Sequence, residues 1–370
     1  MATADPDAAP AAALKEMFNE ARYRALADEL SKVHSPFDRK RFLALTLDGL
    51  ADRSLLQRLR RTSEALRETL PSDYEDALAV LRKLAPRVKH SFVSIVLPDF
   101  VGLYGRQHYE LSLEALKFFT PLGSSEFGIR AFLRDDLKRT LRVMASWAAD
   151  PDEHVRRLAS EGSRPRLPWS FRLEPIAQDP ELTAPILKKL LNDPSLYVRK
   201  SVANHLNDHS KGHPEWLVDW LQAQDLQSAE ARWIAKRALR TLVKKGHPRA
   251  LSLIGVSGKA DLASVEFLVA PRRVKLGQRI ELSFTLRAGG RTAQRLVIDY
   301  ALHFVKSNGS TSAKVFKWKE VTLEPGAMFG LTKTQRIQDF TTRKHYPGRH
   351  RIELLINGHA VAESAFMLQG

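Results

Sequence analysis

A stretch near the middle of the chain and its partial copy limit the possible folds more than any other feature of the sequence. Residues 150–158 read DPDEHVRRL, and residues 193–200 repeat the pattern as DPSLYVRK. The offset of about 43 residues is typical of stacked two-helix units, in which each unit buries the apolar face of the next. We therefore predict a helical-repeat solenoid around these residues.

Helical periodicity extends well beyond the two copies. Over roughly the first 250 residues, apolar side chains recur at spacings of three and four, as at Leu78, Leu81 and Leu84. Prolines, which are poorly tolerated inside helices, divide this region into pieces of helix-pair length. The sequence thus predicts a HEAT-like α-solenoid over residues 14–257, preceded by a disordered, Ala- and Pro-rich terminus at residues 1–13.

The pattern changes after Gly258. Apolar residues then alternate with polar ones, as at Ile280, Leu282 and Phe284, and turns rich in Gly and Asn separate the runs. About seven short strands in this length indicate an antiparallel sandwich of immunoglobulin-like type, although the Cys and Trp hallmarks of antibody domains are absent. The predicted fold is therefore mainly α, a HEAT-like solenoid followed by a small all-β sandwich at residues 258–370.

The chain is strongly basic. Its 370 residues carry a formal net charge of +16, and residues 259–370, with 18 Lys+Arg and 9 Asp+Glu, contribute +9 of it. An excess of this size favours a polyanionic partner such as nucleic acid or an anionic membrane surface. The absence of cysteine excludes disulfides, thiolate nucleophiles and cysteine-ligated zinc. Neither a membrane-spanning apolar run nor a secretory signal is visible, so we expect a cytoplasmic protein without a membrane partner.

Two carboxylates fall at related places in the repeated units. Glu161 ends the helix of the first copy, before a basic, proline-stiffened loop at residues 162–170. In the second copy Lys200, Asn204 and Asp208 form one row with a spacing of four, which places Asp208 one turn beyond the equivalent of Glu161. Because adjacent repeats stack, both anions are expected to point into one groove among cations.

These carboxylates leave two interpretations open. In the first they form ordinary surface ion pairs, Glu161 with Arg157 and Asp208 with Lys211 or Lys200, worth under about 1 kcal/mol each. In the second they stabilise positive charge on a nucleic acid held by the surrounding cations. The pattern of residues alone does not decide between them.

Three long segments, in the same order along the chain, carry a resemblance to a known family. They are residues 124–130 (SSEFGIR), 155–169 (VRRLASEGSRPRLPW) and 198–208 (VRKSVANHLND). They resemble AlkC-type DNA glycosylases, which belong to the AlkD-like group of HEAT-repeat alkylation-repair enzymes. The similarity extends over nearly the whole chain, including the helix at residues 14–19 and the Ig-like tail of one AlkC branch.

The resemblance implies an alkylbase DNA glycosylase that initiates base excision repair. Its expected substrates are cationic N-methylated bases in duplex DNA, chiefly 3-methyladenine and 3-methylcytosine, with 1-methyladenine as a further candidate. The family acts on a base still in or near the stack, without full flipping. No cofactor and no metal are expected, and the protein is expected to be a monomer. The alternative function is a non-catalytic HEAT-repeat scaffold that binds DNA or protein.

The resemblance also implies roles for individual residues. The catalytic carboxylates of the family map onto Glu126, Glu161 and Asp208, and its aromatic residue at the lesion maps onto Trp169. We expect this tryptophan to pack against the deoxyribose or the lesion, or else to plug its loop onto the next repeat. One departure is visible in the Glu126 segment, where Gly and Ala stand at positions 128 and 131 in place of the Ala and Pro of the family pattern.

Basic residues around the proposed site are expected to contact DNA phosphates, because neutralising phosphates releases counterions. These residues are Arg164, Arg166, Arg199, Lys200, Lys211, Arg237, Arg240, Lys244 and Lys245. The alternative for each of these residues is a place on a solvated face without a contact to DNA. His205, His209 and His213 recur every four residues, but the glycine and proline at 212 and 214 end the helix there, so a metal site is not predicted.

Overall fold

The computed structural model describes residues 14–89, 92–256, 258–340 and 343–370. The chain divides into two compact units, residues 1–212 and residues 213–370, and each is considered by itself. The expected disordered terminus at residues 1–13 lies outside the described residues, and so does Ser257, at the predicted boundary between solenoid and sandwich. Among the described residues, no helix combines the length and the apolar character that crossing a membrane requires.

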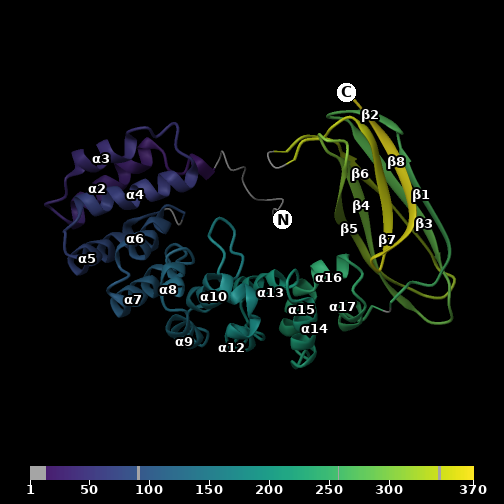
Figure 1. The fold of residues 1–370 in the computed structure, drawn as a ribbon, viewed down its shortest axis with the longest axis horizontal. Coiled ribbons are helices and arrows are strands. Elements are labelled where there is room, and N and C mark those ends of the chain that lie inside the picture. The colour runs from purple at the N-terminus through teal and green to yellow at the C-terminus, as the bar shows by residue number, and fades with distance from the viewer. Residues whose placement is uncertain (1–13, 90–91, 257, 341–342) are drawn as a thin grey trace. The chain divides into compact units, whose positions relative to one another are not determined.

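The first unit is helical, and its helices follow one another in chain order (Figure 1). Many begin at an Asp, Asn or Ser whose side chain accepts a hydrogen bond from a first-turn N–H, as Asp73, Asp152 and Ser195 do. Its elements are α2 (Glu20–Val33), α3 (Arg39–Leu47), α4 (Leu55–Thr69), α5 (Tyr74–Leu84), η1 (Ala85–Arg87), η2 (Val93–Ile95), α6 (Val96–Tyr104), α7 (Tyr109–Phe119), α8 (Ile129–Asp135), α9 (Leu137–Trp147), α10 (Glu153–Gly162), α11 (Glu174–Gln178), η3 (Pro180–Leu182), α12 (Ala184–Lys189) and α13 (Leu196–His209).

The sequence copies that begin at residues 150 and 193 form the same turn. Arg156 donates from Nη1 to the carbonyls of Asp150 (2.9 Å) and Pro151 (2.8 Å), and Arg199 donates from Nη1 to the equivalent carbonyls of residues 193 (3.0 Å) and 194 (2.8 Å). Arg156 also binds the carboxylate of Asp193 at 2.7 Å, which joins the first copy to the second. The recurrence of the sequence is thus a recurrence of backbone contacts, and it fixes how α10 and α13 pack together.

The second unit begins with helices and continues as strands. Its helices are α14 (Pro214–Gln222), α15 (Ala229–Ala238), α16 (Arg240–Lys244) and α17 (Pro248–Leu253). Its strands are β1 (Leu262–Ala270), β2 (Arg273–Lys275), β3 (Arg279–Ala288), β4 (Gln294–Val305), β5 (Thr311–Leu323), β6 (Met328–Arg336), β7 (Gly348–Ile356) and β8 (His359–Gln369). The change from helix to strand therefore falls between residues 253 and 262.

The strands form a sandwich of two sheets, in the orders β1-β3-β6 and β2-β8-β7-β4-β5. All pairs are antiparallel except β2 with β8. Buried side chains of both sheets share one core, for example Phe284 from the first sheet and Tyr300 and Phe366 from the second. The period-two pattern of the sequence is the alternation between this core and the outer faces, so the prediction of helices followed by a β-sandwich is confirmed.

Helices of the second unit are tied to β4 and β5. Glu320 on β5 binds Lys236 of α15 at 2.5 Å and Arg295 of β4 at 3.2 Å. The backbone approaches most closely where Gly246 meets Gly358, because a Cβ added to Gly358 would lie 2.1 Å from the Cα of Gly246. Both glycines have φ above +70°, so any other residue would meet strain as well as a clash.

Candidate active site

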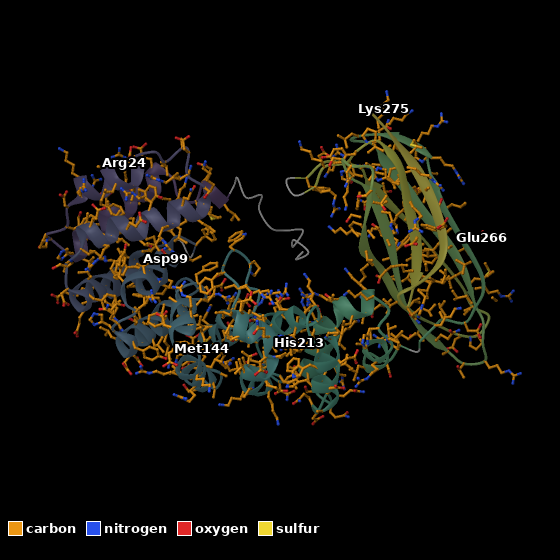
Figure 2. The ribbon with its side chains drawn as sticks, viewed as in Figure 1. Arg24, Asp99, Met144, His213, Glu266 and Lys275 are labelled. Carbon is orange, nitrogen blue, oxygen red and sulfur yellow. The ribbon has the colours of Figure 1, made fainter. Side chains whose placement is uncertain are left out.

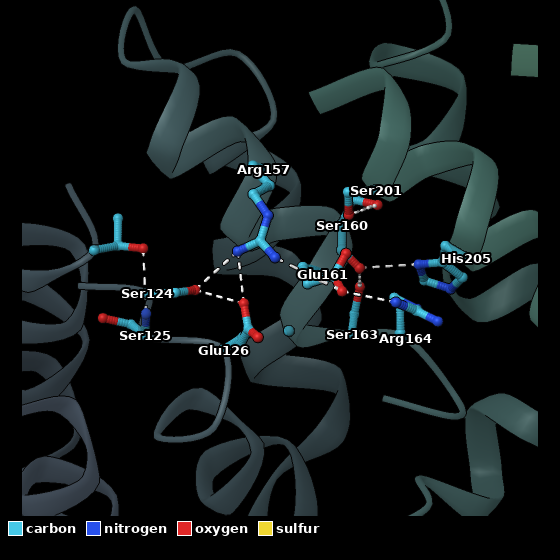
Figure 3. Close-up of polar contacts among 12 residues, drawn as sticks. Ser124, Ser125, Glu126, Arg157, Ser160, Glu161, Ser163, Arg164, Ser201 and His205 are labelled. Atoms are coloured by element: carbon cyan, nitrogen blue, oxygen red, sulfur yellow. Dashed lines mark hydrogen bonds and ion pairs between the residues drawn. The ribbon is translucent and has the colours of Figure 1, made fainter. Parts of the chain in front are cut away.

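Three carboxylates from three parts of the helical unit form the candidate active site, which Figure 3 shows in part. Glu126 lies just before α8, Glu161 in the last turn of α10, and Asp208 in the last turn of α13. The end of α10 packs directly on α8, because a Cβ at Gly162 would lie 2.5 Å from Cγ2 of Ile129. The glycine that follows Glu161 is therefore what allows this carboxylate to approach the α8 segment.

Glu161 is the central carboxylate of the group. Only 6% of the residue is exposed, and its Oε1 accepts a hydrogen bond from Nη1 of Arg164 at 2.7 Å. Nη2 of Arg157 lies 3.7 Å from the same oxygen. Helical geometry explains the Arg157 contact, because residues four positions apart share one face, whereas Arg164 lies beyond the end of α10 and reaches Glu161 from the loop. The predicted Glu161–Arg157 pair is present, but the shorter contact is with Arg164.

Asp208 is joined to Glu161 through the same arginine. Arg164 binds Asp208 with two hydrogen bonds, from Nε at 2.9 Å and from Nη2 at 3.2 Å. The sequence interpretation expected Asp208 to pair with Lys211 or Lys200 and Arg164 to contact DNA phosphate, whereas the structure binds Arg164 to Asp208. The Arg164 side chain is 9% exposed and is held by two carboxylates, a geometry that a planar guanidinium provides and a lysine ammonium does not.

Glu126 is linked to the group through Arg157 (Figure 3). Nη1 of Arg157 donates to Oε2 of Glu126 at 2.6 Å and to the hydroxyl of Ser124 at 2.9 Å, and that hydroxyl donates to Glu126 at 2.5 Å. The ring of Tyr197, from the first turn of α13, covers the guanidinium with its centroid 4.7 Å from Cζ. Arg157 and Arg164 together therefore connect all three carboxylates.

The arginines determine the charge state of Glu161. Burial alone would raise its pKa, but the charges of Arg164 and Arg157 and hydrogen bonds from Ser201 and Arg164 outweigh that effect and hold the pKa below the ordinary value of 4.5. The pKa of Arg164 is raised: burial opposes the charged form, but the Glu161 and Asp208 carboxylates more than offset this. Glu161 is thus an anion at neutral pH and is not available as an acid.

His205 is a buried, neutral histidine that lies next to this group. It is fully buried, its Nδ1 donates to the carbonyl of Ser160 at 3.0 Å, and its Nε2 lies 3.2 Å from the hydroxyl of Thr183. Burial, with His209 as a further cause, lowers its pKa well below 6.5. His205 therefore links α13 to the residue next to Glu161. Within the described ranges, no three His, Asp or Glu side chains are grouped as a metal ion would require.

Trp169 lies in the loop between α10 and α11. Its φ is +65°, in the left-handed region that bulky residues rarely adopt, and 54% of the residue is exposed. Trp169 also lines a small apolar cavity with Phe18, Leu56 and Phe127. The ring is thus presented at the surface and is not buried as a plug on the next repeat.

The other expected phosphate contacts fall into two groups. Arg166, Lys200 and Lys211 in the first unit are exposed, as are Arg237 and Lys245 in the second. The remaining side chains make local contacts: Arg199 forms the turn described above, Arg240 donates to the carbonyl of residue 237 at 2.7 Å, and Lys244 lies 3.4 Å from the carbonyl of residue 315. The exposed group is the part of the expectation that remains a proposal for DNA contact.

Comparisons with known proteins agree with this architecture. The family described as "DNA alkylation repair enzyme" matches residues 123–242, which include the three carboxylates, and the family described as "Uncharacterised protein YhaZ, C-terminal Ig-like domain" matches residues 263–370. The chain is 40% identical to the protein YhaZ of Bacillus subtilis (strain 168) over 346 residues, 93% of this chain and 96% of the relative.

A solved structure decides the family. The Pseudomonas fluorescens alkylpurine DNA glycosylase AlkC, bound to DNA containing an abasic site analog, is 50% identical to this chain, with a TM-score of 0.94 and coverage of 96% of this chain and 99% of that chain. This chain belongs to the AlkC family of DNA glycosylases. The resemblance inferred from three sequence segments is therefore confirmed over nearly the full length of the chain.

Sequence reasoning about this AlkC-family enzyme missed several residues around the carboxylates. The sequence predicts no role for Ser124, Arg130 or Tyr197, and for Arg157 it predicts only the pair with Glu161. Ser124, Arg130 and Arg157 lie inside the segments that carry the resemblance, and this position is a signal for a role in the site. Tyr197 gave no such signal, because its place over Arg157 depends on how α13 packs against α10.

Proposed function

We propose that this glycosylase hydrolyses the N-glycosidic bond of cationic N-methylated bases in duplex DNA, namely 3-methyladenine, 3-methylcytosine and 1-methyladenine, and so initiates base excision repair. The observation that carries the proposal is the group of three carboxylates, Glu126, Glu161 and Asp208, held by Arg157 and Arg164. The DNA-bound state of the AlkC structure supports DNA as the partner. The proposed enzyme acts as a monomer without a cofactor.

The chemistry suits anions better than acids. When the bond between C1′ and the base nitrogen breaks, its electron pair goes to the base, and a base that is already cationic leaves as a neutral molecule without gaining a proton. The sugar develops oxocarbenium character, which nearby carboxylates stabilise, and one of them orients the attacking water and accepts its proton. At about 4 Å and an effective dielectric of about 20, one such charge is worth roughly 4 kcal/mol, or close to a thousandfold in rate.

The shape of the site favours a target base that stays in or near the stack. Enzymes that flip their target hold it in an enclosed pocket. The cavity beside Trp169 has a volume of about 10 Å³, which is about the space that one water molecule needs. We therefore assign the exposed face of Trp169 to the deoxyribose or to the edge of the lesion.

The rate of base release should be nearly independent of pH in the neutral range. Because the pKa of Glu161 is held below 4.5, its carboxylate is charged throughout the neutral range, and loss of that charge should slow the reaction only in acid, as the pH falls through the pKa. Single-turnover rates measured between about pH 6 and pH 8 should therefore vary by less than about twofold. A bell-shaped profile centred in this range would indicate a general acid and would contradict the mechanism.

The experiment that tests the function is release of free methylated bases from methylated duplex DNA, separated by chromatography. Duplexes containing uracil or hypoxanthine are the control substrates, because these neutral bases leave poorly without a proton donor. We expect release from the cationic lesions alone. Tight DNA binding without release from any substrate would instead support the non-catalytic scaffold.

Affinity for DNA should depend on salt through the exposed cations of the first unit. Lys200→Ala and Lys211→Ala should each weaken binding to all duplex sequences alike and reduce the slope of log K against log[salt] by about 1. Lys32→Ala is the control, because that lysine is paired with Glu29 on α2. Unchanged slopes in both test variants would show that these lysines are exposed to solvent and do not contact DNA phosphates.

A further inference from the structure

Arg130 is a buried cation beside the candidate active site, and the proposed reaction gives it no role. It lies in the first turn of α8, is 0% exposed, and is the largest of the fully buried side chains in the described part of the chain. Burying a guanidinium is costly unless its charge and its N–H groups are compensated. A chain that keeps such a group beside its active site requires a physical reason for it.

The compensation comes from three backbone carbonyls. Nη1 of Arg130 donates to the carbonyls of Gly162 at 3.0 Å and Arg164 at 2.7 Å, and Nη2 donates to the carbonyl of Phe171. The ring of Phe171 lies over the guanidinium, 5.2 Å from Cζ. The Gly162 carbonyl lies at the C-terminal end of α10, where the helix dipole favours a cation, and the Arg164 carbonyl lies two residues beyond that end. Arg130 thus joins the end of the Glu161 helix to a second segment of chain.

The two attachment points enclose residues 165–170, the loop that carries Trp169. Two backbone hydrogen bonds tighten this loop, from the N–H of residue 170 to the carbonyl of Leu167 at 3.3 Å and from the N–H of Leu173 to the carbonyl of Pro165 at 3.2 Å. The positive φ of Trp169 is a strained conformation, which persists only where the surroundings hold it in place. Arg130 supplies that restraint at both ends of the loop.

We propose that Arg130 is a positioning residue of the glycosylase reaction, which holds the Trp169 loop at a fixed place relative to Glu161. The inference rests on the proposed function, because it concerns the same site. In this proposal, the distance between the Trp169 side chain and the Glu161 carboxylate depends on the Arg130 guanidinium and its three backbone acceptors. A shift of about 1 Å in such a spacing is enough to cost about a hundredfold in rate.

The charge of Arg130 has to be separated from its geometry. Burial and the charge of Arg164 lower its pKa to about 10, while Asp208, Glu126 and Glu161 oppose this, so the group remains a cation at neutral pH. Lysine at this position keeps that charge but cannot reach three carbonyls with a planar fork. Arg130→Lys is therefore a variant in which the loop is released and the field on the carboxylates is largely kept.

The test compares Arg130→Lys with Arg134→Lys. Arg134 lies on the same helix with its guanidinium 5.2 Å from the same Phe171 ring, but it is exposed. We expect Arg130→Lys to speed amide hydrogen exchange across residues 163–173 and to lower the single-turnover rate at least about tenfold, with DNA affinity little changed. Arg134→Lys should match the wild type in exchange and in rate.

A double-mutant cycle with Trp169→Ala shows whether Arg130 acts through the loop. In the Trp169→Ala background, Arg130→Lys should lose most of its effect on the rate. If Arg130→Lys fails to fold, Pro168→Gly replaces it, because this exposed proline stiffens the same loop and its loss should reduce the rate in the same Trp169-dependent way. Fully additive effects, or unchanged exchange in the loop, would overturn the proposal.

The outcomes also separate this inference from the proposed function. If the wild type releases no methylated base while Arg130→Lys still loosens residues 163–173, the function is wrong and the restraint of the loop stands. If the wild type releases base and neither Arg130→Lys nor Pro168→Gly changes the rate, the function stands and the positioning role is wrong.

Discussion

Glu161→Gln should lower the single-turnover rate of base release by about a hundredfold to a thousandfold. The amide keeps the size of the side chain and one oxygen for the hydrogen bond from Arg164, but it removes the charge that faces the developing cation on the sugar. DNA affinity should be retained or slightly increased, because an anion in a phosphate-binding surface opposes binding. Chromatographic release assays at saturating enzyme, together with binding isotherms, measure the two effects separately.

The control for this variant is Glu174→Gln. Glu174 is exposed on α11 and forms a 3.3 Å surface pair with Arg172, so its neutralisation should leave the rate within about twofold of the wild type. Equal rates for Glu161→Gln and the wild type would mean that the central carboxylate is structural. That result would shift the catalytic role to Glu126 or Asp208.

Arg164→Met should be the most destabilising single change in the site. The substitution leaves two carboxylates, Glu161 and Asp208, without the cation that binds both, and breaking a buried ion pair costs about 3–5 kcal/mol. Urea unfolding at neutral pH measures this as a lower midpoint. Base release should fall as well, because the two anions no longer have a fixed spacing.

The pH dependence of that loss identifies its cause. Without Arg164, burial and mutual repulsion should raise the folded-state carboxyl pKa values above their unfolded values, so the penalty is absent at low pH and grows as the pH rises through the folded values. The stability gap between Arg164→Met and the wild type should therefore narrow as the pH falls towards about 4.5, the ordinary glutamate value. A gap that is the same at every pH would assign the loss to packing. Arg166→Met, at an exposed position in the same loop, is the matched control.

The architecture could be predicted because it follows local rules. The copies at residues 150 and 193 contain the arginines and the helix caps that build the same turn twice, and the period-two pattern after residue 258 follows the two faces of the sandwich. Both signals lie within a few residues of the structure that they specify. The order of the strands depends on long-range pairing, such as that of β2 with β8, and no short pattern records it.

The sequence predicted the carboxylates of the candidate site and the Glu161–Arg157 pair, but not the place of Arg164 between Glu161 and Asp208. Glu161 and Asp208 were placed by the periodicity of their helices, which is reliable over a few turns. For Arg164 the sequence predicts a phosphate contact, because an arginine in a basic loop cannot be told from any other surface arginine by its sequence alone. Only the fold of that loop turns the Arg164 side chain back onto both carboxylates. One of them, Asp208, is 44 residues away from Arg164 in the sequence. Sequence spacing does not contain such a contact.

Arg157 and Arg164 join three carboxylates from separate segments of the helical unit, and this has a consequence for partly unfolded forms of the protein. Each carboxylate comes from a different segment of the chain. No single segment therefore contains all three carboxylates together with the two arginines that bind them. If α13 detaches, Arg164 loses Asp208 and Arg157 loses its cover of Tyr197 in the same event. Loss of activity on mild heating should therefore be all-or-none for each molecule, which makes base release a reporter for local melting in the middle of the chain.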